Sequence, residues 1–116
     1  MSDVTLYHNP RCSKSRQALE LLRARAIAPT IVEYLNSPPS IDELDRILKL
    51  LGLEPRDLMR RKEAVYKDLA LDDESHDRHS LLQAMVEHPI LIERPIAVAN
   101  GRASIGRPPE NVLGVL

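Results

Sequence analysis

Alternating apolar and polar residues predict a short strand near the start of the chain, over residues 4–7. Asn9 and Pro10 end that strand, and a helix with one apolar face follows. The apolar positions of that helix recur at helical spacing: Ala18, Leu19, Leu22 and Ala26. A second strand is predicted over residues 30–34, and its Ile-Val run is typical of a strand buried on both faces of a sheet. Together these elements predict a βαβ unit with parallel strands.

The middle of the chain, about residues 40–88, is predicted to be helical and to form an insertion in a smaller α/β core. Ser40 and Glu43 have the spacing of a capping box at a helix start, and Gly52 is placed to end that helix. Pro55 suits the first position of another short helix. Apolar residues at helical spacing continue through the block: Leu44, Ile47, Leu48, Leu51, Val65, Tyr66, Leu69, Leu71, Leu81, Leu82, Met85 and Val86.

Two further strands are predicted near the C-terminus, over residues 96–99 and 102–105. They are joined by Asn100-Gly101, the strongest short signal for a hairpin with a type I′ turn. A turn at residues 106–109 then leads into a last short helix with apolar residues at Val112, Leu113 and Leu116. The order βαβ, helical insertion, ββα predicts an α/β protein with a thioredoxin-like fold and a small mixed sheet. We expect one domain over residues 1–116.

The charge and composition of the chain argue against several classes of partner. A net charge of −1 gives no global attraction to nucleic acid or to a membrane surface, and three tyrosines as the only aromatic residues offer little base stacking. No apolar run approaches membrane-spanning length, and no signal peptide is visible. A single cysteine cannot form an internal disulfide, which fits a reducing compartment. We therefore expect a cytoplasmic protein without a nucleic-acid or membrane partner.

The single cysteine, Cys12, lies where the first strand passes into the first helix. Backbone N–H groups at a helix N-terminus have no partner within the helix, and the helix dipole presents positive charge there. Both effects favour a thiolate, as do the nearby cations Arg11, Lys14 and Arg16. The same features would hold an oxyanion beside the sulfur. The pattern therefore favours a nucleophilic cysteine in an anion pocket over the small buried hydrophobe that most free cysteines are.

Three polar neighbours of Cys12 have open roles at this point. Ser13 and Ser15 could cap the helix or donate to an anion, and His8 could pair with the thiolate or pack at the end of the strand. A metal site is not expected, because there is no second cysteine and the other histidines lack the spacing of zinc ligands. The motif Cys12-x-x-Ser15 also excludes dithiol exchange within one chain.

Four separated motifs stand in order along the chain: His-Asn-Pro-Arg-Cys-Ser-Lys-Ser-Arg at residues 8–16, Arg60, Glu-Arg-Pro-Ile at residues 93–96 and Gly-Arg-Pro-Pro at residues 106–109. Together they resemble the motifs of the ArsC-type arsenate reductases that depend on glutathione and glutaredoxin. The resemblance covers nearly the whole chain. It is to a short member of that family, since the sequence ends soon after the last predicted helix, whereas the longer arsenate reductases continue further.

The resemblance implies roles for particular residues. Cys12 matches the nucleophile of the family, and three arginines would hold the oxyanion: Arg60, Arg94 and Arg107. The supporting residues would be His8, Ser15 and Pro95, of which Pro95 matches a proline that is typically cis and borders the cysteine. His8 would lower the pKa of Cys12 or orient the pocket. Arginine suits this task because its planar fork matches the paired oxygens of a tetrahedral oxyanion better than the point charge of lysine does.

The resemblance also implies a reaction, the reduction of arsenate to arsenite. The Cys12 thiolate would attack arsenic and form a covalent thiol–arsenate adduct. No bound cofactor is expected, and because the chain has no second cysteine the next thiol must come from outside. The resemblance implies glutathione as co-substrate, followed by glutaredoxin. The alternatives are a non-catalytic regulator or interaction protein of the same superfamily, and a thiol oxidoreductase that acts on glutathione mixed disulfides.

Overall fold

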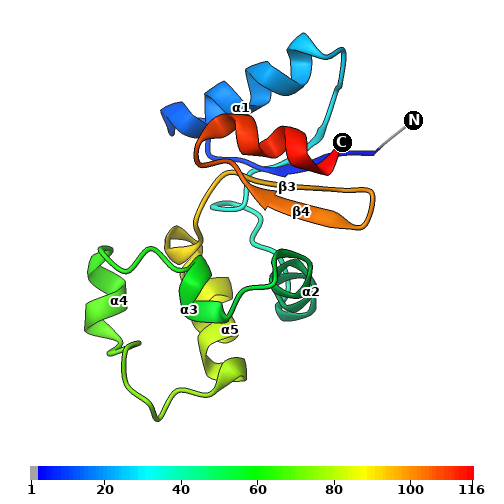
Figure 1. The fold of residues 1–116 in the computed structure, drawn as a ribbon. Coiled ribbons are helices and arrows are strands. Elements are labelled where there is room, and N and C mark those ends of the chain that lie inside the picture. The colour runs from blue at the N-terminus through cyan, green and yellow to red at the C-terminus, as the bar shows by residue number, and fades with distance from the viewer. Residues whose placement is uncertain (1–2) are drawn as a thin grey trace. The chain divides into compact units, whose positions relative to one another are not determined.

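The computed structural model describes residues 3–116 and divides them into two compact units. Residues 3–37 and 94–116 form the first, which we call the sheet unit, and residues Pro38–Glu93 form the second, the helical unit (Figure 1). The predicted insertion, about residues 40–88, falls inside the helical unit. That the two units form one domain stays a prediction.

The sheet unit contains one mixed four-stranded sheet in the order β2-β1-β3-β4. Its strands are β1 (Thr5–Tyr7), β2 (Thr30–Val32), β3 (Ile96–Ala99) and β4 (Arg102–Ile105). Strands β1 and β2 are parallel, with Leu6 opposite Ile31, which confirms the predicted βαβ unit. Strand β3 pairs with β1 and with β4 in antiparallel fashion. The predicted small mixed sheet is therefore confirmed.

The prediction that the second strand is buried on both faces is wrong. Strand β2 lies at the edge of the sheet and spans three residues instead of the five expected. Thr30 is exposed, Ile31 is 39% exposed, and Val32 is half-buried. An edge strand has a neighbour on one side alone, so its apolar residues receive less cover than those of a central strand.

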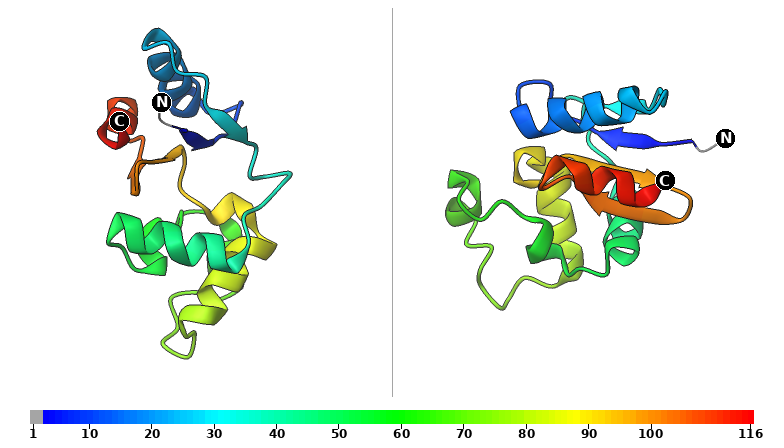
Figure 2. Two further views of the ribbon diagram at one scale, coloured as in Figure 1. Left: turned by 90° about the vertical axis from the view of Figure 1, so that its right-hand side faces the viewer. Right: turned by 45° about the horizontal axis from the view of Figure 1, so that its top comes forward.

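Helix α1 (Ser13–Ala24) and the 3₁₀ helix η2 (Pro109–Val115) lie side by side against one face of the sheet (Figures 1 and 2). The core between these layers consists of small and aliphatic side chains from β1, α1, β3, η2 and the residues beside them: Val4, Leu6, Ala18, Leu19, Leu22, Ala97, Ala99, Val112 and Val115. Two of the apolar residues assigned to helical spacing lie outside this core. Ala26 is exposed beyond the end of α1 at φ 61°, and Leu116 is exposed after η2, which is a 3₁₀ helix.

Two sharp backbone features shape the C-terminal part of the sheet unit. Asn100 and Gly101 have φ angles of 55° and 68°, as the central residues of a type I′ turn require, so the predicted hairpin is confirmed. The Asn100 side chain also donates from Nδ2 to the carbonyl of Val115 at 2.8 Å. The peptide bond before Pro95 is cis, as the resemblance implied, and the bond before Pro108 is cis as well.

The helical unit consists of α2 (Ile41–Leu51), α3 (Pro55–Leu58), α4 (Ala64–Asp68), α5 (Arg78–Glu87) and the 3₁₀ helix η1 (Pro89–Leu91). The capping box that begins α2 is confirmed. The Glu43 backbone N–H donates to Ser40 Oγ at 3.1 Å, and the Ser40 N–H donates to Glu43 Oε1 at 3.4 Å. Gly52 ends α2 at φ 69°. Across residues 3–116, no helix is both long enough and apolar enough to cross a membrane.

Candidate active site

Cys12 is the N-cap residue of α1, where the sequence placed it. Its backbone is extended, with φ −91° and ψ 123°, and its carbonyl accepts the first helical hydrogen bond from the Arg16 N–H at 3.0 Å. The Cys12 N–H donates to the Asn9 carbonyl at 3.0 Å, so a tight turn connects the loop after β1 to the helix. The half-buried sulfur therefore lies at the positive end of the α1 dipole.

The surroundings of the sulfur lower the pKa of Cys12 below its ordinary value. Partial burial by itself raises the pKa. It is outweighed by the Ser15 backbone N–H, the Arg94 guanidinium, the Lys14 backbone N–H and the Arg107 guanidinium, all of which favour the thiolate. The predicted contribution of the helix N-terminus is thus present and comes from the N–H groups of Lys14 and Ser15.

The cations that act on Cys12 differ from the ones that the local sequence indicated. Arg11, Lys14 and Arg16 are all exposed, and Arg16 donates from Nη1 to the carbonyl of Pro10 at 3.0 Å. The cationic contributions to the lowered pKa come from distant arginines that the fold brings to the sulfur. The predicted direction of the pKa shift is therefore confirmed, and the leading cationic contributions come from Arg94 and Arg107.

Arg107 contacts the sulfur directly. Its Nη2 lies 3.8 Å from Cys12 Sγ, across 95 residues of sequence. Its Nε donates to the Arg94 carbonyl at 2.9 Å, and its own carbonyl accepts from Asn111 Nδ2 at 3.1 Å. The guanidinium thus donates to a backbone carbonyl through Nε and contacts the Cys12 sulfur through Nη2.

Arg94 lies directly before Pro95 and belongs, like Arg107, to the sheet unit. The Nε and Nη1 atoms of its guanidinium are buried, and the charge of this group helps to lower the pKa of Cys12. Arg94 thus acts on the site in two ways: its side chain supplies charge, and its carbonyl orients Arg107. The second of these contributions was not apparent from the sequence, because nothing in a sequence pattern shows which carbonyl a distant side chain meets.

His8 and Ser15 form a buried pair beneath the Cys12 loop. His8 Nδ1 lies 2.6 Å from Ser15 Oγ, and the same oxygen accepts the Asn9 N–H at 3.0 Å. Ser15 is 0% exposed and His8 is 5% exposed. Burial lowers the pKa of His8, which keeps its ring neutral near pH 7. Of the roles left open for His8, these contacts favour packing and orientation of the loop. The Ser15 hydroxyl is used in hydrogen bonds within the protein.

Arg60, the third predicted oxyanion ligand, lies in the helical unit. Its Nη1 is paired with Glu63 Oε2 at 3.0 Å, and its backbone N–H donates to the Leu91 carbonyl at 2.7 Å. Both contacts lie within the helical unit, where they fix the segment that follows α3. A role for Arg60 at the oxyanion stays a prediction.

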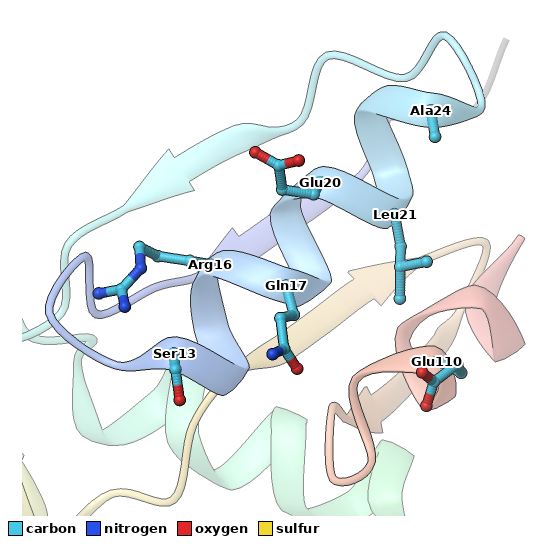
Figure 3. Close-up of a pocket in the computed structure, with 7 residues that line it drawn as sticks. All are labelled: Ser13, Arg16, Gln17, Glu20, Leu21, Ala24 and Glu110. Carbon is cyan, nitrogen blue, oxygen red and sulfur yellow. The ribbon is translucent and has the colours of Figure 1, made fainter.

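A groove of about 640 Å³ lies along α1 and begins at Ser13, the residue after Cys12. Figure 3 shows Gln17 and Leu21 pointing from α1 toward η2, which contributes Glu110. The other lining residues also come from α1: Arg16, Glu20 and Ala24. The groove has polar side chains at the Cys12 end and apolar side chains farther along the helix, a feature that the sequence did not reveal.

The ArsC family matches residues 7–115, which include Cys12, Arg60, Arg94 and Arg107. This chain belongs to the ArsC family. The arsenate reductase of Neisseria meningitidis serogroup A is 50% identical over 117 residues, with 100% of both chains covered. YfgD of Escherichia coli K12, whose name states no activity, is 53% identical over 114 residues, which cover 97% of this chain and 96% of YfgD.

Among solved structures, an arsenate reductase from Vibrio cholerae is similar, with a TM-score of 0.95 and 53% identity over 98% of each chain. This likeness confirms the predicted α/β, thioredoxin-like architecture for the ArsC chain described here. The resemblance noted from the four motifs is therefore confirmed at the level of the family and of the fold.

Proposed function

We propose that this ArsC-family protein is an arsenate reductase that converts arsenate to arsenite. The proposal rests on three features that surround the Cys12 sulfur. They are the N-terminus of α1, the charge of Arg94, and Arg107 Nη2 at 3.8 Å from Cys12 Sγ. A thiolate beside two guanidinium groups and the N-terminal N–H groups of a helix suits the attack of sulfur on a tetrahedral oxyanion. Full-length relatives near 50% identity that are named arsenate reductases support the same conclusion.

In the proposed first step, the Cys12 thiolate attacks the arsenic of arsenate. A bond forms between Sγ and arsenic, and one arsenate oxygen takes up protons and leaves as water, so arsenic stays in its +5 state. Arg94 and Arg107 stabilise the charge on the remaining oxygens, which is greatest as the bond forms. Arg60 is the proposed third oxyanion ligand, while His8 and Ser15 hold the Cys12 loop in place.

In the proposed second step, an external thiol completes the reduction, because Cys12 is the single cysteine of the chain. The thiolate of glutathione attacks the Cys12 sulfur, and the electron pair of the S–As bond passes to arsenic, which leaves as arsenite. Each of the two sulfurs gives up one electron, and Cys12 remains in a mixed disulfide with glutathione. A glutaredoxin thiol then removes the glutathione and restores the Cys12 thiolate.

The proposal is tested by steady-state reduction of arsenate with glutathione and glutaredoxin supplied. We expect turnover by the wild-type protein, none above background by Cys12→Ser, and nearly full turnover by Ser37→Ala, a change at an exposed serine outside the site. Wild-type turnover no higher than that of Cys12→Ser would overturn the enzyme and favour a non-catalytic regulator. Rapid reduction of a glutathione mixed disulfide without any arsenate turnover would favour a thiol oxidoreductase.

A further inference from the structure

Gly106 lies in the turn between β4 and η2 and is packed without space for a side chain. A Cβ atom on this residue would lie 2.6 Å from Cγ of Pro95 and 2.9 Å from Cγ1 of Val112. Carbon atoms do not approach so closely, so any larger residue requires a shift of the surrounding atoms. The φ angle of Gly106 is outside the left-handed region, so this position requires glycine for space and not for backbone conformation.

The close packing at Gly106 connects the two segments that carry the arginines of the site. The Gly106 N–H donates to the Pro95 carbonyl at 2.8 Å, which joins the turn to the segment after Arg94. The next residue, Arg107, donates from Nε to the Arg94 carbonyl at 2.9 Å and places Nη2 at 3.8 Å from Cys12 Sγ. The arginine contacts thus depend on a short distance between the turn and Pro95.

A side chain at residue 106 would push the turn away from Pro95 and not the reverse. Val112 is fully buried in the core between the sheet and η2, and Pro95 is also buried, so neither has room to move. Arg107 is exposed, so the turn that carries it meets less resistance. Relieving the 2.6 Å contact to an ordinary 3.4 Å requires a shift of about 0.8 Å, which would move Arg107 away from a sulfur contact that is already at 3.8 Å.

We propose that Gly106 is a positioning residue, whose lack of a side chain sets the distance between the Arg107 guanidinium and the Cys12 sulfur. This inference rests on the proposed function in taking Cys12 as the nucleophile. The experiment measures the reactivity of the Cys12 thiol, so its result does not depend on whether arsenate is the substrate.

The test is the rate of Cys12 alkylation by iodoacetamide as a function of pH, for Gly106→Ala, Arg107→Ala and the double variant. The charged groups that face the sulfur are Arg94 and Arg107, so moving Arg107 away raises the pKa of Cys12. We expect both single variants to slow alkylation at pH 6 by roughly threefold to tenfold. The double variant should be no slower than Arg107→Ala, because the displaced group is already absent.

Gly114→Ala is the matched control, because a Cβ at residue 114 has no atom within 4 Å and its profile should equal that of the wild type. Circular dichroism verifies folding. If Gly106→Ala does not fold, the measurement moves to Gly106→Ala with Val112→Ala, which removes the contact at 2.9 Å, and Val112→Ala alone is its reference. The proposal is overturned if a folded Gly106 variant has the same pH profile of alkylation as its reference protein, which is the wild type or Val112→Ala. It is also overturned if the effects of Gly106→Ala and Arg107→Ala add in the double variant. Failure of both Gly106 variants to fold would overturn it as well, since Gly106 would then serve the fold alone.

Discussion

The reactivity of Cys12 has a local source and a distant one. The local source is the start of α1, whose Lys14 and Ser15 N–H groups stabilise the thiolate, and it follows from a cysteine placed at an N-cap. The distant source is the pair Arg94 and Arg107, which the chain brings back from its C-terminal third. A peptide of the Cys12 loop alone would therefore reproduce only part of the lowered pKa.

The first prediction concerns the pH at which Cys12 becomes reactive. Because its pKa is lowered, the thiolate forms at a lower pH than that of a free cysteine, and alkylation by iodoacetamide should reach its midpoint below about 8.5. Arg94→Ala should move the midpoint upward, whereas Arg102→Ala, a change at an exposed residue of β4, should leave it in place. A wild-type midpoint at or above the free-cysteine value would contradict this account of the site.

The second prediction concerns the buried hydroxyl of Ser15. Ser15→Ala removes the oxygen that meets both His8 Nδ1 and the Asn9 N–H, and a buried polar group without its partner costs about 1–3 kcal/mol. We expect the free energy of unfolding to fall by about that amount in urea titrations. Ser13→Ala, in the same helical turn but exposed, should change it by less than about 0.5 kcal/mol. Equal effects of the two substitutions would show that the buried pair contributes no stability.

The third prediction concerns the protonation of His8. Burial lowers the pKa of His8, and Arg23 and Arg16 act in the same direction against Glu33. The unfolded chain therefore binds a proton more readily than the folded one, so this residue's contribution to stability is present above about pH 6.5 and is lost as pH falls through the lower, folded pKa. NMR titration of the His8 ring should give a midpoint below 6.5. A midpoint at or above 6.5 would contradict a neutral, buried ring.

At the scale of the elements, local signals succeeded where the structure depends on local chemistry. The capping box of α2 and the Asn100-Gly101 turn are set by residues within four positions of one another, and both are confirmed. The prediction that β2 is buried on both faces was wrong, because an apolar run gives no information on which strands lie beside it. The position of a strand within a sheet is decided by pairing between distant segments: here β2 pairs with β1, and β3 occupies the other side of β1, which leaves β2 at the edge.

The fourth prediction tests the capping box. Ser40→Ala removes the oxygen that accepts the Glu43 N–H, and loss of such a cap costs about 0.5–2 kcal/mol. Thermal and urea unfolding should show this loss. Ser37→Ala is the matched control, because Ser37 is exposed in the preceding loop and donates to Glu33 through its backbone N–H. An equal effect of both changes would mean that the cap is not what stabilises α2.

At the scale of the whole molecule, more of the fold than of the candidate site could be predicted from the sequence. The order of strands and helices followed from the hydrophobic pattern, and the identity of Cys12 followed from its place before a helix. The arginines did not follow from physics alone, because Arg107 reaches the sulfur across 95 residues and no local pattern marks it. They came from the family resemblance, and the structure shows both Arg94 and Arg107 acting on Cys12, while their role as oxyanion ligands stays a prediction. The buried His8–Ser15 pair and the close packing at Gly106 are visible only in the structure.

The measurement that tests the central claim most directly is kcat/KM for arsenate in Arg107→Ala, compared with Arg102→Ala. Arg107 contacts the Cys12 sulfur, whereas Arg102 is exposed at the start of β4. A hydrogen bond to a charged group is worth about 1.5–3 kcal/mol, so Arg107→Ala should lower kcat/KM by roughly ten- to a hundredfold. Arg107→Lys should give an intermediate value, because lysine restores the charge without the planar fork. Arg102→Ala should match the wild type. Equal kcat/KM for the two alanine variants, with thermal melts showing both folded, would contradict an oxyanion site built from Cys12 and Arg107.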